Sequence, residues 1–273
     1  MQRLKNKTVI ITGASRGIGR SIALRFAKDG ANIVIAAKTV KPHSILSGTI
    51  FSVAKEIEAI GGKVLPLKVD VRDESDIEKM AFKSANFFGG IDILINNAGA
   101  IKLTNTNETT SKYYDLMNSV NVRAAFLSIK ACLPYLKESL HAHVLNMSPP
   151  ISFNPIWLKN NVAYTISKYG MTLCTLGMSA EFEKYKIAVN SLWPKTAIAT
   201  AAIVSLMGND AIKHCRKADI IADAAYAIIT EDPSKLTGQM LLDENFLRLK
   251  GIKDFKKYAC KHGEELYPDF YID

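Results

Sequence analysis

Short apolar runs alternate with longer helical patterns along most of the chain, and this alternation restricts the possible folds more than any other feature. Strands separated by helices form right-handed crossovers, so we expect an α/β fold, with a doubly wound parallel sheet of about seven strands and helices on both faces. Runs rich in β-branched residues predict strands at Thr8–Ile11, Asn32–Ala37, Lys63–Val69, Ile91–Ile95, His143–Met147, Ile187–Leu192 and Gln239–Leu242. Helices are predicted near residues 18–29, 50–61, 74–87, 112–138, 162–184 and 219–230.

The chain contains no evident linker, repeat or low-complexity stretch, so we expect residues 1–273 to form a single domain. Two connections are longer than the rest. Thr39–Gly48 contains a proline, and Lys195–Lys217 contains a break at Gly208-Asn209-Asp210. We expect the second, at about 195–217, to be a substrate loop over the carboxyl ends of the strands, where ligands bind in open sheets. Residues from about 245 to 273 are expected to form a C-terminal extension.

Composition and charge argue against several classes of protein. The four cysteines form no CxxC pair and the five histidines form no HxxxH or HExxH pair, so we expect neither a disulfide framework nor a metal site. The net charge of +9 comes from scattered basic residues without a nucleic-acid motif, which favours anionic small molecules as partners. We see no membrane span, signal peptide or targeting tail and expect a cytoplasmic protein, with a peroxisomal or mitochondrial location as the alternative.

A glycine-rich turn, Thr12-Gly13-Ala14-Ser15-Arg16-Gly17-Ile18-Gly19, follows the first predicted strand and opens the first predicted helix. Glycines let the backbone approach a pyrophosphate, and the free N–H groups of a helix start attract its oxygens. Glycine alone is weak evidence, because any tight turn can use it. The strand–turn–helix context is also present here, so we predict a Rossmann-type dinucleotide site.

The end of the second predicted strand indicates which dinucleotide binds. NAD enzymes carry a carboxylate there that bonds to the adenosine ribose 2′-hydroxyl, but this chain has Ala36-Ala37-Lys38-Thr39. Lys38 and Arg16 suit a 2′-phosphate instead, although both could be ordinary surface cations. We therefore predict NADP(H) as the cofactor.

Polar residues also follow the third and fourth predicted strands at the same edge of the sheet. Asp70 is placed either to accept a hydrogen bond from the adenine amino group or to cap the next helix. Asn97, within Asn96-Asn97-Ala98-Gly99, closes the floor of a cofactor cleft or makes a turn.

Tyr164 and Lys168 lie four residues apart on one face of a predicted helix. An ammonium beside a phenol favours the phenolate, so we expect a lowered pKa for Tyr164 and a better proton donor and acceptor. The spacing is common by chance and becomes specific only together with the glycine turn.

These segments together resemble the short-chain dehydrogenase/reductase family over nearly the whole chain, and the ordered set is highly specific. The resemblance rests on TGASRGIG, Asp70, NNAG, Asn121 and YTISK. It implies that Tyr164 is the general acid/base, that Lys168 binds the nicotinamide ribose and lowers the Tyr164 pKa, and that Asn121 holds a water for proton relay. The implied cofactor-binding residues are Gly13, Ser15, Arg16, Gly17, Ile18, Gly19, Lys38, Asp70, Val71, Asn97 and Lys168.

Two positions depart from the family pattern. The serine that orients the substrate carbonyl falls on Pro149, which has no donor. Ser148 is our candidate for that role and Ser152 is the alternative. Lys195 stands where the family commonly has glycine, so it adds a cation near the substrate entrance or points to solvent.

Three stretches, at 32–38, 145–150 and 193–196, resemble one branch of the family in which a sterol-carrier domain can follow the reductase domain. We expect the reductase domain alone here. Resemblance to the family also implies a homo-oligomer, a dimer or tetramer, formed through the helices at 112–138 and 162–184.

The leading functional prediction is an NADP(H)-dependent oxidoreductase that interconverts a carbonyl and an alcohol on a lipid-like or acyl molecule. The alternative is a dinucleotide-binding regulatory or scaffold protein with little turnover. An apolar substrate is indicated by the residues expected to line the cleft, which are Ile151, Phe153, Ile156, Trp157, Leu158, Ile203, Leu206 and Met207.

Overall fold

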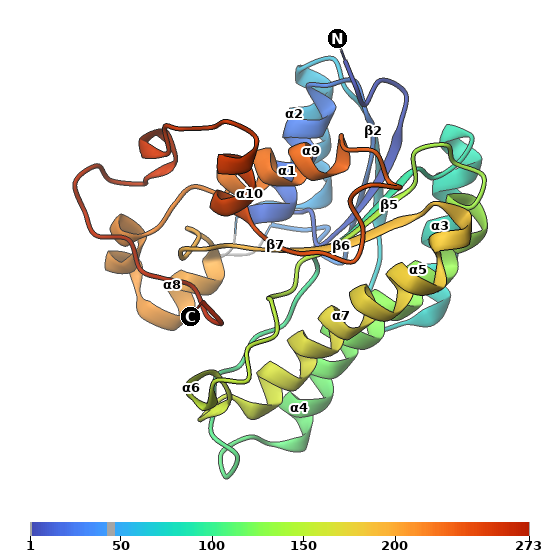
Figure 1. Cartoon of the computed structure of the whole chain (residues 1–273). Coiled ribbons are helices and arrows are strands. Elements are labelled where there is room, and N and C mark those ends of the chain that lie inside the picture. Colours follow the sequence, from blue (N-terminus) through green and yellow to red (C-terminus); the bar gives the residue numbers. More distant parts are fainter. Residues whose placement is uncertain (1, 43–46, 273) are drawn as a thin grey trace.

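The computed structural model describes residues 2–42 and 47–272, which contain a seven-stranded sheet whose neighbouring strands all pair in parallel (Figure 1). The strand order is β3-β2-β1-β4-β5-β6-β7, which adds one strand to the usual Rossmann order and confirms the predicted fold class. The strands are β1 (Thr8–Thr12), β2 (Asn32–Ala37), β3 (Lys63–Lys68), β4 (Ile93–Asn96), β5 (His143–Asn146), β6 (Ala188–Trp193) and β7 (Met240–Leu242).

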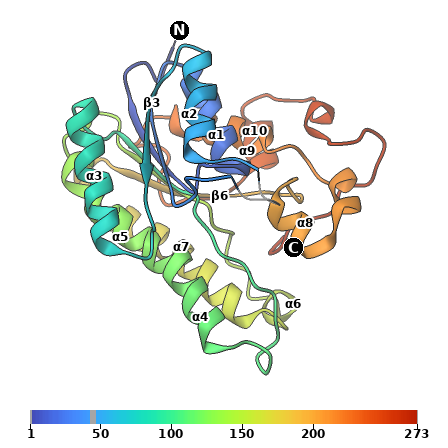
Figure 2. The same cartoon turned by 180° about the vertical axis from the view of Figure 1, so that it is seen from behind.

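Helices cover both faces of the sheet (Figures 1 and 2). Neighbouring residues of a strand point to opposite faces, so Ile33 and Ile35 of β2 pack in one apolar core and Val34 in the other. Because both faces are covered, the central strands are apolar at nearly every position. One face carries α1 (Gly17–Ala27), α2 (Ile50–Ala59), α9 (Asp219–Ile229) and α10 (Asp243–Leu249), and the other carries α3 (Glu74–Phe88), α5 (Ala124–Leu136) and α7 (Val162–Glu181).

The helix predicted at 112–138 consists of three consecutive segments. α4 (Ser111–Asn118) leads into a π-helical turn, Ser119–Arg123, and then into α5. A π-helical turn adds one residue to a helical turn, which a 3.6-residue apolar period does not reveal, and such turns are frequent at functional sites. Asn121 lies in the middle of this turn. The other predicted strands and helices are present, and their ends differ from the prediction by at most three residues.

The predicted substrate loop is partly helical. It contains α8 (Ala201–Met207) and a 3₁₀ segment, Asn209–His214, with the predicted break at Gly208, whose φ is 82°. The sequence pattern did not predict α8 because none of its residues is buried, so no apolar stripe marks it. Of the other long connection, Thr39–Gly48, residues 43–46 lie outside the described residues.

The chain beyond α10 returns over the carboxyl edge of the sheet and ends beside α8 (Figure 1). Pro268 forms an antiparallel bridge with Thr196, directly after β6, and Ala197 donates a 2.9 Å hydrogen bond from its N–H to the Tyr267 carbonyl. This segment, residues 267–270, is called the return segment below. It brings the C-terminal extension to the edge at which ligands bind in open sheets.

Candidate active site

A cavity of about 700 Å³ lies at the carboxyl ends of the strands and is lined by residues from both halves of the chain. Tyr164, Lys168 and Asn121 line it, together with every predicted cofactor residue except Gly19. The return segment also lines the cavity, which the sequence patterns did not indicate. The remaining described lining is mostly apolar and includes Ile101, Leu116, Ile198, Ile203, Leu206 and Met207.

The expected apolar lining is correct only in part. Ile203, Leu206 and Met207 line the cavity, but none of the five candidates between residues 151 and 158 does. Phe153 and Ile156 are exposed, and the Trp157 ring packs against Phe270 and Tyr271. The short helix α6 (Pro155–Leu158) carries this stretch outside the cavity.

The glycine turn is held close to the end of β4. A Cβ atom on Gly13 would lie 2.8 Å from the Ala98 Cα, and one on Gly19 would lie 2.5 Å from the Asn97 Nδ2. Asn97 Nδ2 donates hydrogen bonds to the carbonyls of Thr12, at 2.8 Å, and Gly13. Asn97 therefore holds the glycine turn in place. Gly19 does not line the cavity, but its lack of a side chain allows the turn to pack closely against Asn97.

Two cations lie where the 2′-phosphate was predicted. Lys38 follows β2 and is exposed, and Arg16 donates from Nη2 to the Gly48 carbonyl at 3.0 Å. The Arg16 Nε is buried and has no hydrogen-bond partner among the described residues. A buried donor without an acceptor favours an anionic group at this position.

Asp70 is joined to Arg72, a residue that the sequence patterns did not single out. Both carboxylate oxygens of Asp70 accept hydrogen bonds from the Arg72 guanidinium, which lowers the pKa of Asp70 to about 2. Arg72 also lines the cavity. The adenine end of the predicted site thus holds an ionised carboxylate and a third cation.

The Asn121 side chain ties two walls of the cavity together. Its Oδ1 accepts from the Ala100 N–H at 2.9 Å, and its Nδ2 donates to the Ala100 carbonyl and to the Ser167 Oγ. These contacts use both N–H groups of Nδ2 and one lone pair of Oδ1, and the predicted water contact of Asn121 stays a prediction.

Tyr164 and Lys168 lie one turn apart on the buried face of α7, and each is 6% exposed. Lys168 donates from Nζ to the Met147 carbonyl, at the end of β5. Burial lowers the pKa of Lys168 to about 7, although Asp269 opposes this.

The expectation of a lowered Tyr164 pKa is wrong for this structure. Burial raises the pKa of Tyr164 well above its ordinary value, and the neighbouring Tyr271 and Asp269 add to the effect. Desolvation of the phenolate is the largest cause, and the Lys168 ammonium is directed to the Met147 carbonyl. The phenol therefore stays protonated at neutral pH.

The two candidate serines differ in their contacts, and neither lines the cavity. The Ser148 Oγ is buried without a hydrogen-bond partner among the described residues. The Ser152 Oγ accepts from the Asn154 N–H at 3.1 Å, and the Ser152 backbone bonds to the Tyr169 hydroxyl. Ser148 is therefore the one with a free hydroxyl.

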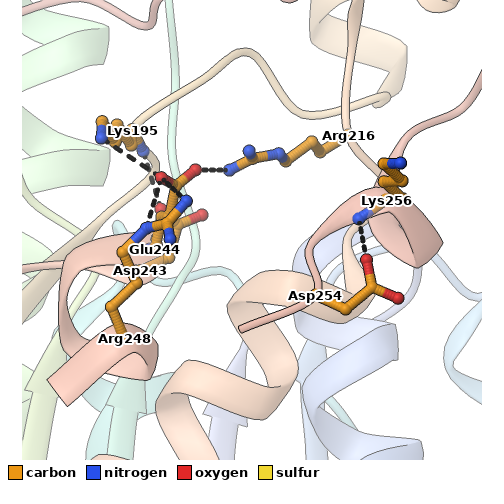
Figure 3. Close-up of polar contacts among 7 residues, drawn as sticks. All are labelled: Lys195, Arg216, Asp243, Glu244, Arg248, Asp254 and Lys256. Carbon is orange, nitrogen blue, oxygen red and sulfur yellow. Dashed lines mark hydrogen bonds and ion pairs between the residues drawn. The ribbon is translucent and has the colours of Figure 1, made fainter. Parts of the chain in front are cut away.

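The Lys195 side chain is 36% exposed, pairs with Glu244 and does not line the cavity. Lys195, Arg216 and Arg248 converge on the buried Glu244 (Figure 3). The Lys195 N–H also bonds to the Asp243 carboxylate at 2.9 Å. These ion pairs fix both ends of the predicted substrate loop to α10. Lys195 and Arg216 are too far from Glu244 in the sequence for a local pattern to indicate the contacts, whereas Arg248 is four residues from Glu244 on α10.

The sequence model of the short chain dehydrogenase family matches residues 7–207 of the chain. The chain belongs to this family. Over 99% of its length, the chain is 58% identical to human hydroxysteroid dehydrogenase-like protein 2. It is 55% identical to the protein of that name from Danio rerio, again over 99% of its length. These relatives belong to the branch indicated by the three stretches. The chain spans 64% of the length of the human relative.

Solved structures of short-chain dehydrogenases match the fold closely. One from Mycobacterium thermoresistibile superposes with a TM-score of 0.94 at 44% identity, covering 99% of this chain and 96% of its own. A metagenomic short-chain oxidoreductase in complex with NADP superposes with a TM-score of 0.73 at 25% identity, covering 88% of this chain and 97% of its own.

Within residues 2–42 and 47–272, no helix is both long and apolar enough to cross a membrane. The same part of the chain holds no group of three or more His, Cys, Asp or Glu side chains that could bind a metal ion.

Proposed function

We propose that this short-chain dehydrogenase is an NADP(H)-dependent oxidoreductase that interconverts a carbonyl and an alcohol on an apolar small molecule. The observation that carries the proposal is that Tyr164 and Lys168 line the same cavity as the glycine turn. A proton donor and a dinucleotide site therefore face one space. The apolar walls of the substrate loop favour a lipid-like or acyl substrate.

The residues present fit a dinucleotide with a 2′-phosphate. Gly17, where an added Cβ would meet only the Thr200 Cγ2 at 3.7 Å, leaves room for a pyrophosphate at the start of α1, where backbone N–H groups favour anionic oxygens. Lys38 and Arg16 offer hydrogen-bond donors to the 2′-phosphate. One of these donors is the Arg16 Nε, which has no hydrogen-bond partner among the described residues. Asp70, Val71 and Asn97 remain proposed cofactor residues on the same cavity wall, and Lys168 is proposed for the ribose.

Bound nicotinamide supplies or accepts the hydride. Tyr164 donates its proton to the substrate oxygen in reduction, and its raised pKa keeps the phenol protonated until that step. Lys168, four residues from Tyr164 on the same face of α7, would bind the ribose and would stabilise the phenolate left behind. We propose that Asn121 holds the water that returns a proton through Lys168.

The cofactor prediction is tested by changing Arg16 and Lys38 together to Ala. We expect NADPH binding to weaken by about 2–5 kcal/mol, since two charge-assisted contacts are lost, while NADH binding changes little. Titration calorimetry with both cofactors measures this. The matched control is Lys63→Ala. Lys63 begins β3, at the end of the strand away from the cofactor site, so this change should leave both affinities unchanged. Equal losses for the two cofactors would contradict NADP(H) specificity.

A second test concerns the serine. A developing alkoxide needs a second hydrogen-bond donor beside Tyr164, so Ser148→Ala is expected to lower kcat by about 10²–10³-fold with NADPH affinity unchanged. Ser152→Ala is the control and should be nearly silent in steady-state kinetics, since its hydroxyl serves the local turn. The opposite result would assign the role to Ser152.

The second candidate function, a dinucleotide-binding regulatory or scaffold protein, is favoured by one observation. Pro149 replaces the usual serine, and neither Ser148 nor Ser152 lines the cavity. Tight NADPH binding without turnover of any ketone, aldehyde or acyl thioester in a broad panel would select this function.

Exposed apolar side chains support the proposed homo-oligomer. Phe126 on α5 and Leu173 on α7 are 48% and 59% exposed, on the helices predicted to pair.

A further inference from the structure

The return segment is held in the cavity wall by contacts along its whole length. The Asp269 N–H bonds to the Lys195 carbonyl at 3.2 Å, and the Trp193 Nε1 donates to the Phe270 carbonyl at 2.9 Å. The Tyr271 hydroxyl, just beyond, bonds to the Thr165 Oγ1 on α7 at 3.1 Å. These bonds tie the segment to β6 and to the helix that carries Tyr164, so its position relative to the catalytic pair is fixed.

Asp269 brings a carboxylate to the catalytic end of the cavity. Of the described residues that line the cavity, the acidic ones are Asp70 and Asp269. Asp70 is ion-paired with Arg72, whereas Asp269 has no ion pair within the described chain. Its Oδ1 accepts from the Phe270 N–H at 2.7 Å. The negative charge of Asp269 acts on both proposed catalytic residues, since it raises the pKa of Tyr164 and that of Lys168.

The surroundings of Asp269 compensate its charge only in part. Burial raises the pKa of Asp269 to about 7, although hydrogen bonds from the Phe270 N–H and the Trp193 side chain lower it. Lys168 is directed to the Met147 carbonyl. The ionised carboxylate is therefore destabilised in this mostly apolar cavity, and a further donor on a bound molecule would stabilise it.

We propose that Asp269 is a specificity-determining residue that accepts a hydrogen bond from a hydroxyl group carried by the substrate close to its reacting carbonyl. The preferred substrates are then apolar hydroxyketones, and the products of their reduction are diols. This proposal rests on the proposed function for the identity of the reacting group, but binding of the diol does not depend on turnover.

The test compares octane-1,2-diol with 2-octanol on the NADPH-saturated protein, by calorimetry at pH 8. These alcohols are the products of reducing 1-hydroxy-2-octanone and 2-octanone, and they do not react with NADPH. A hydrogen bond to a charged group corresponds to a preference of about 10–150-fold, so we expect the wild-type protein to bind the diol more tightly by that factor. The two ketones should show a similar ratio of kcat/KM.

Asp269→Ala should reduce the diol preference to within about threefold of unity, because no acceptor for the substrate hydroxyl remains at this position. Asp269→Leu, which keeps a similar side-chain volume but also removes the acceptor, should behave in the same way. The matched control is Asp254→Asn, on the exposed part of the C-terminal extension, and it should keep the wild-type preference. Thermal unfolding verifies that each variant is folded.

A wild-type protein without diol preference, or Asp269 variants that keep it, would overturn the proposal. If diol binding depends on Asp269 but neither ketone is consumed, the specificity site stands and the proposed oxidoreductase function fails for these substrates. The two failures are therefore distinguishable.

Discussion

Replacing Tyr164 with Phe is expected to lower kcat by about 10²–10⁴-fold, the range that a positioned general acid contributes. The ring stays in place and only the proton carrier is lost. The Tyr164 hydroxyl makes no hydrogen bond to another residue of the described chain, so the fold and the NADPH affinity should be nearly unchanged. Steady-state kinetics on a confirmed ketone and calorimetry with NADPH measure the two effects.

Tyr113→Phe is the control for this change, since Tyr113 lies on α4 and is 38% exposed. Its kcat should equal that of the wild-type protein. A Tyr164→Phe protein that keeps most of its turnover would refute the assignment of Tyr164 as the acid/base.

Glu244→Gln is expected to lower the free energy of unfolding at pH 7 by about 3–5 kcal/mol, because it leaves buried positive charge without its counterion. The side chains of Glu244 and Arg216 are 7% and 8% exposed, so solvent cannot compensate for the lost charge. Urea denaturation measures the difference. The control is Glu56→Gln, whose partner Arg20 lies in a half-exposed pair worth at most about 1 kcal/mol.

The same charge cluster predicts the pH dependence of this difference. Burial raises the pKa of Glu244, but hydrogen bonds from Arg216, Arg248 and Lys195 outweigh burial and lower it to about 2, from an ordinary value of 4.5. Stability from the ionised carboxylate is therefore present above pH 4.5 and is lost as the pH falls toward 2. The wild-type and Gln proteins should become similar in stability across that window. A constant difference would contradict the assignment.

Local sequence determined the sheet, the cofactor turn and the catalytic spacing. Apolar strands such as β2, the glycines at 13 and 17, and the four-residue spacing of Tyr164 and Lys168 are each encoded within about one or two turns of chain. Parallel pairing then brought the strand ends to one edge, as the alternation of strands and helices requires. These features were predictable because their physical causes act between near neighbours in the chain.

The tertiary structure decided everything that depends on where irregular chain segments lie. Residues 151–158 leave the cavity, whereas the return segment, more than 100 residues after Tyr164, enters it. Burial, which is a property of the whole fold, reverses the expected direction of the Tyr164 pKa. Glu244 forms ion pairs with Lys195, Arg216 and Arg248, which come from three separate stretches of the chain (Figure 3). No periodic pattern encodes such contacts, because loop paths follow from packing against distant elements rather than from local backbone preference.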